Sequence, residues 1–141
     1  MYQATIHLQQ DKYCILSEFA EKFDVSFSIS IEELYNHQVT FVMEIDGYSE
    51  EITEFFTSSS QVEHFEKLNE GNYLVTKDSC GAYSAVDRNH GILRQRNIIT
   101  DKRREYTVLF FRREDLKAMI DDFKGIGTVA LGKVTKFGES T

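Results

Sequence analysis

Hydrophobic and polar positions follow two different periods along the first half of the chain. Residues 25–31 alternate without interruption, which is typical of a strand with one buried face. Shorter apolar runs predict further strands over 4–8, 39–45 and 62–68. Apolar residues recur at helical spacing in two places, at Ile15, Leu16, Phe19 and Phe23 and at Ile52, Phe55 and Phe56. The predicted order of elements up to residue 70 is βαββαβ.

The second half repeats this order after the polar turn at 69–72. Extended segments are predicted over 73–76, 92–99, 106–111 and 129–134, and a short helix over 79–87. The clearest helix of the chain presents Leu116, Met119, Ile120 and Phe123 on one face and ends at Gly125. We therefore expect a duplication.

The predicted fold is α+β, with two tandem βαββαβ (ferredoxin-like) units that have antiparallel sheets. The first unit covers residues 1–70 and the second covers residues 71–141. The chain contains no proline and no low-complexity linker, so we expect the units to pack as one compact module. The alternative is one irregular α+β domain with a long sheet. A βαββαβ sheet carries helices on one face, so a second sheet, a dimer mate or a ligand is expected to cover the other.

Charge is divided unevenly between the two halves. Up to Glu70 the chain has three basic and fourteen acidic residues, and the remainder has thirteen basic and nine acidic residues. The net charge of -7 argues against the chain being a DNA-binding surface by itself, since affinity for phosphates comes from Lys and Arg. The sequence predicts an acidic first unit and a basic second one.

No apolar run is long enough to cross a bilayer, and the N-terminal residues lack the pattern of a signal peptide. Two cysteines are too few for a disulfide framework. We therefore expect a cytoplasmic protein with reduced thiols. Common nucleotide, zinc and hydrolase motifs are missing, so the sequence predicts no catalytic residues, no metal and no cofactor.

Cys14 and Cys80 occupy equivalent positions in the two halves, near the starts of predicted helices. A helix N-terminus lowers the pKa of a thiol, so both are candidates for redox chemistry. The alternative is that each is a small buried hydrophobic residue.

His7 and His64 lie on strands that neighbour each other in a ferredoxin-like sheet. They form a candidate pair of metal ligands or a pH-sensitive pair. The alternative is that they are two unconnected histidines on the surface of the sheet.

Basic residues gather on one predicted hairpin and the helix entrance that follows it. The candidates for effector binding or an interface are Arg94, Arg96, Arg103, Arg104, Arg112 and Arg113, with Lys102 beside them. Three hypotheses remain open. The cluster binds an anionic effector, contacts the acidic half of a second copy in a dimer, or is a hairpin exposed to solvent.

Four segments together resemble the N-terminal domain of archaeal bacterio-opsin-activator-type transcription regulators. They are residues 14–23 (CILSEFAEKF), 59–62 (SSQV), 112–116 (RREDL) and 131–136 (LGKVTK). In that family a helix-turn-helix follows this region, and the polar end at 136–141 is expected to be a cut within a longer chain. The resemblance implies a non-catalytic domain that senses an effector and forms a dimer, upstream of DNA binding.

Two other classes of function stay open. One is a stand-alone ferredoxin-like module that binds a metabolite, and the other is an enzyme of undetected type. The predicted partners are a second copy of the chain and an unidentified small-molecule or protein effector, with no membrane. DNA would be reached only through the missing C-terminal region.

Overall fold

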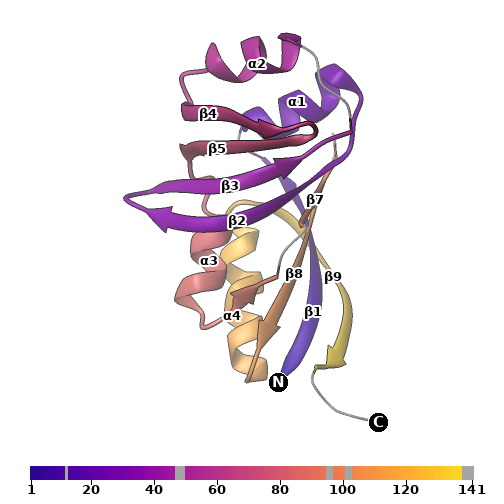
Figure 1. Ribbon diagram of the computed structural model, residues 1–141. Helices are drawn as coiled ribbons and strands as arrows, with labels where there is room; N and C mark the ends of the chain where they lie inside the picture. The colour runs from indigo at the N-terminus through magenta and orange to yellow at the C-terminus, as the bar shows by residue number, and fades with distance from the viewer. Residues whose placement is uncertain (12, 47–49, 95–96, 101–102, 138–141) are drawn as a thin grey trace.

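The computed structural model describes residues 1–11, 13–46, 50–94, 97–100 and 103–137 (Figure 1). The elements up to residue 70 are β1 (Tyr2–Gln10), α1 (Ile15–Phe23), β2 (Phe27–Tyr35), β3 (Gln38–Glu44), α2 (Glu50–Thr57) and β4 (Val62–Asn69). The elements after it are β5 (Asn72–Asp78), α3 (Ala82–Arg88), β6 (Ile92–Leu93), β7 (Asn97–Ile99), β8 (Arg104–Phe110), α4 (Arg113–Lys124) and β9 (Gly127–Lys136). The predicted α+β class is confirmed. The single strand predicted over 92–99 is instead two short strands, β6 and β7.

All nine strands in the described ranges belong to one sheet. Its order is β4-β5-β3-β2-β7-β8-β1-β9, with β6 beside β8, and every pair of neighbours is antiparallel. In Figure 1, β4, β5, β3 and β2 cross the upper part of the molecule, and β8, β1 and β9 run down the lower part. The first strand of the chain therefore lies among strands of the second half, and β5 lies between β3 and β4 of the first.

The turn between β4 and β5 brings β5 directly onto the first-half strands. Gly71 has a φ of 84°, a left-handed conformation that L side chains rarely adopt. A Cβ at this position would lie 2.8 Å from the carbonyl oxygen of Ile45. The Gly71 carbonyl in turn accepts a hydrogen bond of 2.8 Å from the Ile45 backbone N–H. The backbone at 71 is thus packed tightly against the end of β3, where only glycine fits.

Buried apolar residues form two clusters, one under each part of the sheet. The first lies among α1, α2 and strands β2, β3, β5 and β7, and its largest side chains include Phe19, Phe41, Phe56 and Tyr73. The second lies among β1, β8, α3 and α4. Residue 70 separates the halves in sequence but does not separate the cores, because the first core takes β5 and β7 from after this residue and the second takes β1 from before it.

One row of cross-strand partners connects the two cores. Phe27 faces Ile99, Ile99 faces Arg104, and Arg104 faces Leu8. Residues opposite each other in a ladder lie on the same face of the sheet. Phe27 and Ile99 belong to the first core and Leu8 to the second, so both cores lie on one face. Arg104 is the charged member of this row and lies where the cores meet.

The opposite face of the sheet is largely polar. It carries Ser28, Ser30, Thr40, Thr76, Gln3, Thr5, His7, Glu105 and Thr107, all partly exposed. Such a face is compatible with water, so burial of apolar surface does not by itself require a second layer there. Within the described ranges, no helix combines the length and apolar character needed to span a membrane.

Candidate functional site

Arg104 is the most deeply buried of the predicted site residues, with 2% of its surface exposed. Its Nη1 donates to Cys80 Sγ at 3.2 Å and to the Tyr106 hydroxyl at 3.4 Å. Its Nη2 donates to Ser17 Oγ on α1 at 3.4 Å. A single guanidinium on β8 therefore contacts the first turn of α1 and the loop before α3.

No carboxylate in the described part of the chain pairs with this guanidinium. The salt bridges found there join other residues, and the buried Nε–H of Arg104 has no hydrogen-bond partner in the same ranges. A buried cation without a partner is costly, because burial removes the water that would otherwise stabilise its charge. The incompletely paired guanidinium of Arg104 therefore costs stability unless a further partner is bound to it.

Arg104 lies between an open cleft and a much smaller cavity. The open cleft has a volume of about 340 Å³ and is lined by Cys14, Ser17, Arg103 and Arg104, with Asp11, Glu18 and Glu21 among the other residues around it. The smaller cavity has room for about 20 Å³, which is the space of roughly one water molecule. Its walls are mostly apolar, and Arg104, Lys77, Ser79, Cys80 and Tyr106 bring polar groups to it. We call these the outer cleft and the inner cavity.

The two cysteines lie on either side of Arg104. Cys14 immediately precedes α1, is 3% exposed and lines the outer cleft, whereas Cys80 is partly exposed and lines the inner cavity. Burial opposes ionisation of the Cys14 thiol, but the charges of Arg104 and Lys77, with the backbone N–H of Leu16, outweigh burial and lower its pKa. The thiol that faces the open cleft is thus biased toward the thiolate.

Lys77 and Tyr106 complete the polar cluster. Lys77 is a second buried cation, 3% exposed, and its Nζ donates to the Asp78 carbonyl. Burial raises the pKa of Tyr106 to about 12, although Arg104 opposes the shift, so the phenol is neutral at physiological pH. The pKa of Arg104 is raised further above its usual range: burial opposes the charge, but Tyr106 and the two thiols outweigh it. The cluster holds two buried positive charges and is suited to an anion.

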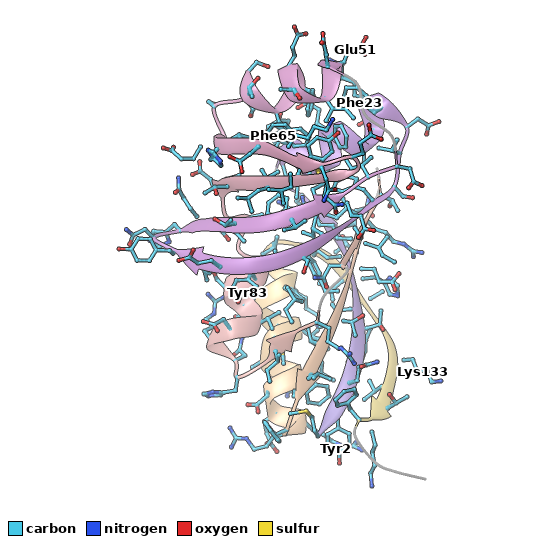
Figure 2. All side chains as sticks on the ribbon, in the orientation of Figure 1. Tyr2, Phe23, Glu51, Phe65, Tyr83 and Lys133 are labelled. Atoms are coloured by element: carbon cyan, nitrogen blue, oxygen red, sulfur yellow. The ribbon has the colours of Figure 1, made fainter. Side chains whose placement is uncertain are left out.

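Figure 2 shows Tyr83, which also lines the inner cavity, where α3 meets the strands of the upper part of the sheet. Leu16 of α1 and Phe41 of β3 line the same cavity. Residues from both cores therefore surround this space. A ligand that entered it would contact both parts of the molecule at once.

The other predicted basic residues do not gather around Arg104, except for Arg103. Arg94 is exposed, donates to Gln3 Oε1 at 2.9 Å and stacks over the ring of Phe137. Arg112 precedes α4 and pairs with Asp115 at 3.3 Å. Arg113 begins α4 and lines a separate groove beside Phe110, the last residue of β8, which lies roughly 20 Å from Arg104 along the strand. Arg96 and Lys102 lie outside the described residues.

The prediction that His7 and His64 converge is wrong. His7 is on β1 and His64 is on the edge strand β4, and β5, β3, β2, β7 and β8 lie between those two strands. The prediction assumed that β1 would pair with β4, but β1 pairs with β8 and β9 instead. His7 lies 4.0 Å from Glu105, and His64 lies 3.8 Å from Glu66.

Sequence reasoning did not single out Lys77, Ser17 or Tyr106, and it assigned Arg104 to an exposed hairpin. One signal was present, because Arg104, Tyr106 and Val108 alternate with Glu105 and Thr107. This period of two places Arg104 on the same face as apolar residues. In the structure that face is the buried one.

The chain matches no protein-family model, no curated protein and no solved structure. In the described ranges, no group of three or more His, Cys, Asp or Glu side chains is arranged to hold a metal ion.

Proposed function

We propose that this chain is a non-catalytic sensory domain that binds a small anionic effector at Arg104. The observation that carries the proposal is a guanidinium that is 2% exposed, has no carboxylate partner among the described residues and retains an unpaired Nε–H. Arginine binds carboxylates and phosphates through two parallel N–H groups, and a buried one does so more strongly than an exposed one. A ligand anion would supply the missing partner.

The surroundings favour a singly charged anion. The outer cleft of about 340 Å³ has the size of a small metabolite. Asp11, Glu18 and Glu21 also line it, and their negative charges would repel a phosphate or a dicarboxylate more strongly than a monocarboxylate. The apolar walls of the inner cavity suit a short hydrocarbon or aromatic tail, if the cavity widens on binding. The proposed effector class is a small monocarboxylate.

The strand order supports an interpretation of the fold as two ferredoxin-like units that exchange their first strands. The order β4-β5-β3-β2 is that of the fourth, first, third and second strands of one unit, with β5 in the place of β1. The order β9-β1-β8-β7 is the same arrangement with β1 in the place of β5. In this interpretation, Arg104 lies at the interface between the two units. An effector bound there would change the stability of that interface.

We place this domain in a transcription regulator of the archaeal bacterio-opsin-activator type, in the cytoplasm and as a dimer. In that setting, a helix-turn-helix beyond Thr141 would bind DNA, and this domain would report the effector to it. The open edges on β4 and β9 support association between copies, because an edge strand presents unpaired backbone groups. A helix-turn-helix coding segment after residue 141 would support this setting, and a natural stop codon there would favour the alternative of a stand-alone metabolite-binding module.

A thermal-shift screen tests the effector proposal. The panel contains acetate, propionate, benzoate, succinate and inorganic phosphate at equal ionic strength. A ligand present at one hundred times its dissociation constant stabilises the folded state by about 2.7 kcal/mol, which raises the melting temperature by roughly 5–10 °C in a domain of this size. We expect a saturable shift with at least one monocarboxylate and a smaller one with succinate. The absence of any shift across the panel would overturn the proposal.

A further inference from the structure

Cys14 combines three features that act on one thiol. It lines the open outer cleft, it stands at the start of the nine-residue helix α1, and it lies beside the buried and incompletely paired guanidinium of Arg104. Lys77, a second buried cation, acts on the same thiol. A positive environment with a path to solvent is what makes a cysteine nucleophilic, since the thiolate is the reactive form.

We propose that Cys14 is a modification site for hydroperoxides, with Arg104 as the residue that positions and stabilises the reactive thiolate. The thiolate attacks one oxygen of the peroxide O–O bond, so an S–O bond forms while the O–O bond breaks. The leaving alkoxide, or hydroxide from hydrogen peroxide, takes up a proton and departs as alcohol or water. Sulfur loses two electrons and becomes a sulfenic acid, and the peroxide is reduced by the same two electrons.

Cys80 provides an internal comparison. Its Sγ accepts a hydrogen bond from Arg104 at 3.2 Å, but it faces the inner cavity, which has room for only about one water molecule. Cys80 is nevertheless the more exposed of the two residues. A reactivity set by exposure alone would therefore favour Cys80, whereas the electrostatic and cleft geometry favours Cys14. The two explanations therefore predict opposite orders of reactivity for Cys14 and Cys80.

This site shares Arg104 with the proposed effector site but requires no bound anion. Oxidation of Cys14 would remove the negative charge that faces the guanidinium when Cys14 is a thiolate. An anion that bound Arg104 would in turn compete with the thiolate. The two proposals can fail separately, because one is tested with peroxide alone and the other with carboxylates alone.

Two single-cysteine variants of the full chain test the proposal. Cys80→Ser leaves Cys14 as the only thiol, and Cys14→Ser leaves Cys80, since the chain has two cysteines. Each is treated with hydrogen peroxide in the presence of dimedone, which traps sulfenic acid, and labelling is followed by intact mass. Because the thiolate fraction rises as the pKa falls while nucleophilicity declines, we expect Cys14 to be labelled roughly five to ten times faster than Cys80. Equal rates, or faster labelling of Cys80, would overturn the proposal.

The role of Arg104 is tested on the Cys80→Ser background. Arg104→Gln should slow labelling of Cys14 by roughly fivefold, whereas Arg94→Gln, which changes an exposed arginine, should leave the rate unchanged. If Arg104→Gln does not fold, as judged by circular dichroism, Lys77→Met tests the same electrostatic effect. An unchanged rate in a folded Arg104 or Lys77 variant would show that the cations do not activate Cys14.

Discussion

Arg104 Nη1 lies 3.2 Å from Cys80 Sγ, and this contact joins the two parts of the molecule. Arg104 begins β8, a strand that packs mainly in the second core. Cys80 follows β5, a strand that packs in the first core. The contact exists because β5 is inserted between β3 and β4, far from the strands that follow it in sequence. This position of β5 in the sheet therefore brings the parts of the candidate site together.

Replacing Arg104 by Met tests whether the guanidinium serves binding or stability. No carboxylate among the described residues pairs with the guanidinium, so its removal leaves no buried carboxylate without its partner. We expect Arg104→Met to fold, with a free energy of unfolding within about 2 kcal/mol of the wild type at neutral pH. Urea denaturation followed by circular dichroism measures this. Loss of the folded state would show that Arg104 is needed for structure.

The pKa of Cys14 predicts a dependence of stability on pH. The folded state lowers the pKa below its ordinary value of 9.0, so the folded protein binds fewer protons than the unfolded chain in the interval between the two values. The stabilisation is complete above pH 9.0 and is lost as the pH falls through the lowered value. Arg104, Lys77, Tyr13 and Tyr106 interact electrostatically with this thiol, and Asp11, Glu18 and Glu21 line the same cleft.

The measurement compares the wild type with Cys14→Ser by urea denaturation at several pH values from about 6 to 10. The free energy of unfolding of the wild type should rise relative to the variant across this range. A constant difference between the two proteins would mean that Cys14 titrates alike in the folded and unfolded states.

The proposed exchange of strands predicts how the chain behaves when it is divided. Fragment 1–70 lacks β5, which supplies Tyr73 and Val75 to the first core, and fragment 71–141 lacks β1, which supplies Ile6 and Leu8 to the second. We expect neither fragment to fold alone and the two to form the sheet when mixed, since each core is then complete. Circular dichroism and gel filtration of the separate and mixed fragments test this. A fragment that folds by itself would show that a unit can close without the exchanged strand.

Gly71→Ala tests the turn that directs β5 to the first core. The new Cβ would meet the Ile45 carbonyl oxygen at 2.8 Å on a backbone with φ of 84°. We expect the free energy of unfolding to fall by about 1–3 kcal/mol. Gly125→Ala is a suitable control, because its φ is -75° and the nearest atom, the Asp122 carbonyl oxygen, lies at 3.3 Å. Equal losses in the two variants would argue against a special role for the turn.

The sequence predicts most of the helices and strands, but it does not predict which strands pair with each other. The helices over 15–23 and 113–124 follow from apolar spacing, and β2 and β3 follow from alternation. The placement of β1 and β5 does not, because every second residue is buried along most of both strands and either strand would fit beside β3 or β8. Pairing is decided by how Tyr73, Val75, Ile6 and Leu8 fit their cores, which is a property of tertiary packing.

The candidate site was predicted only in part, for a related reason. Cys14, Cys80 and Arg104 were named, but the hypothesis that the arginines form one surface treated Arg104 like Arg112. The alternation of residues 104–108 places Arg104 on the apolar face of its strand, but it does not show that this position lies at the junction of two cores. The contact with Ser17 spans 87 residues and exists only once β8 pairs with β1 and β7.

The most direct test of the effector site is a calorimetric titration of the wild type, Arg104→Gln and Arg94→Gln. The titrant is the monocarboxylate that gives the largest thermal shift in the screen. Losing a buried charge-assisted hydrogen-bond partner costs a ligand about 2–5 kcal/mol, which is a factor of at least about thirty in affinity. We predict that Arg104→Gln loses binding by this factor and that Arg94→Gln binds like the wild type. Equal affinities in the wild type and a folded Arg104→Gln variant would show that Arg104 does not bind the carboxylate.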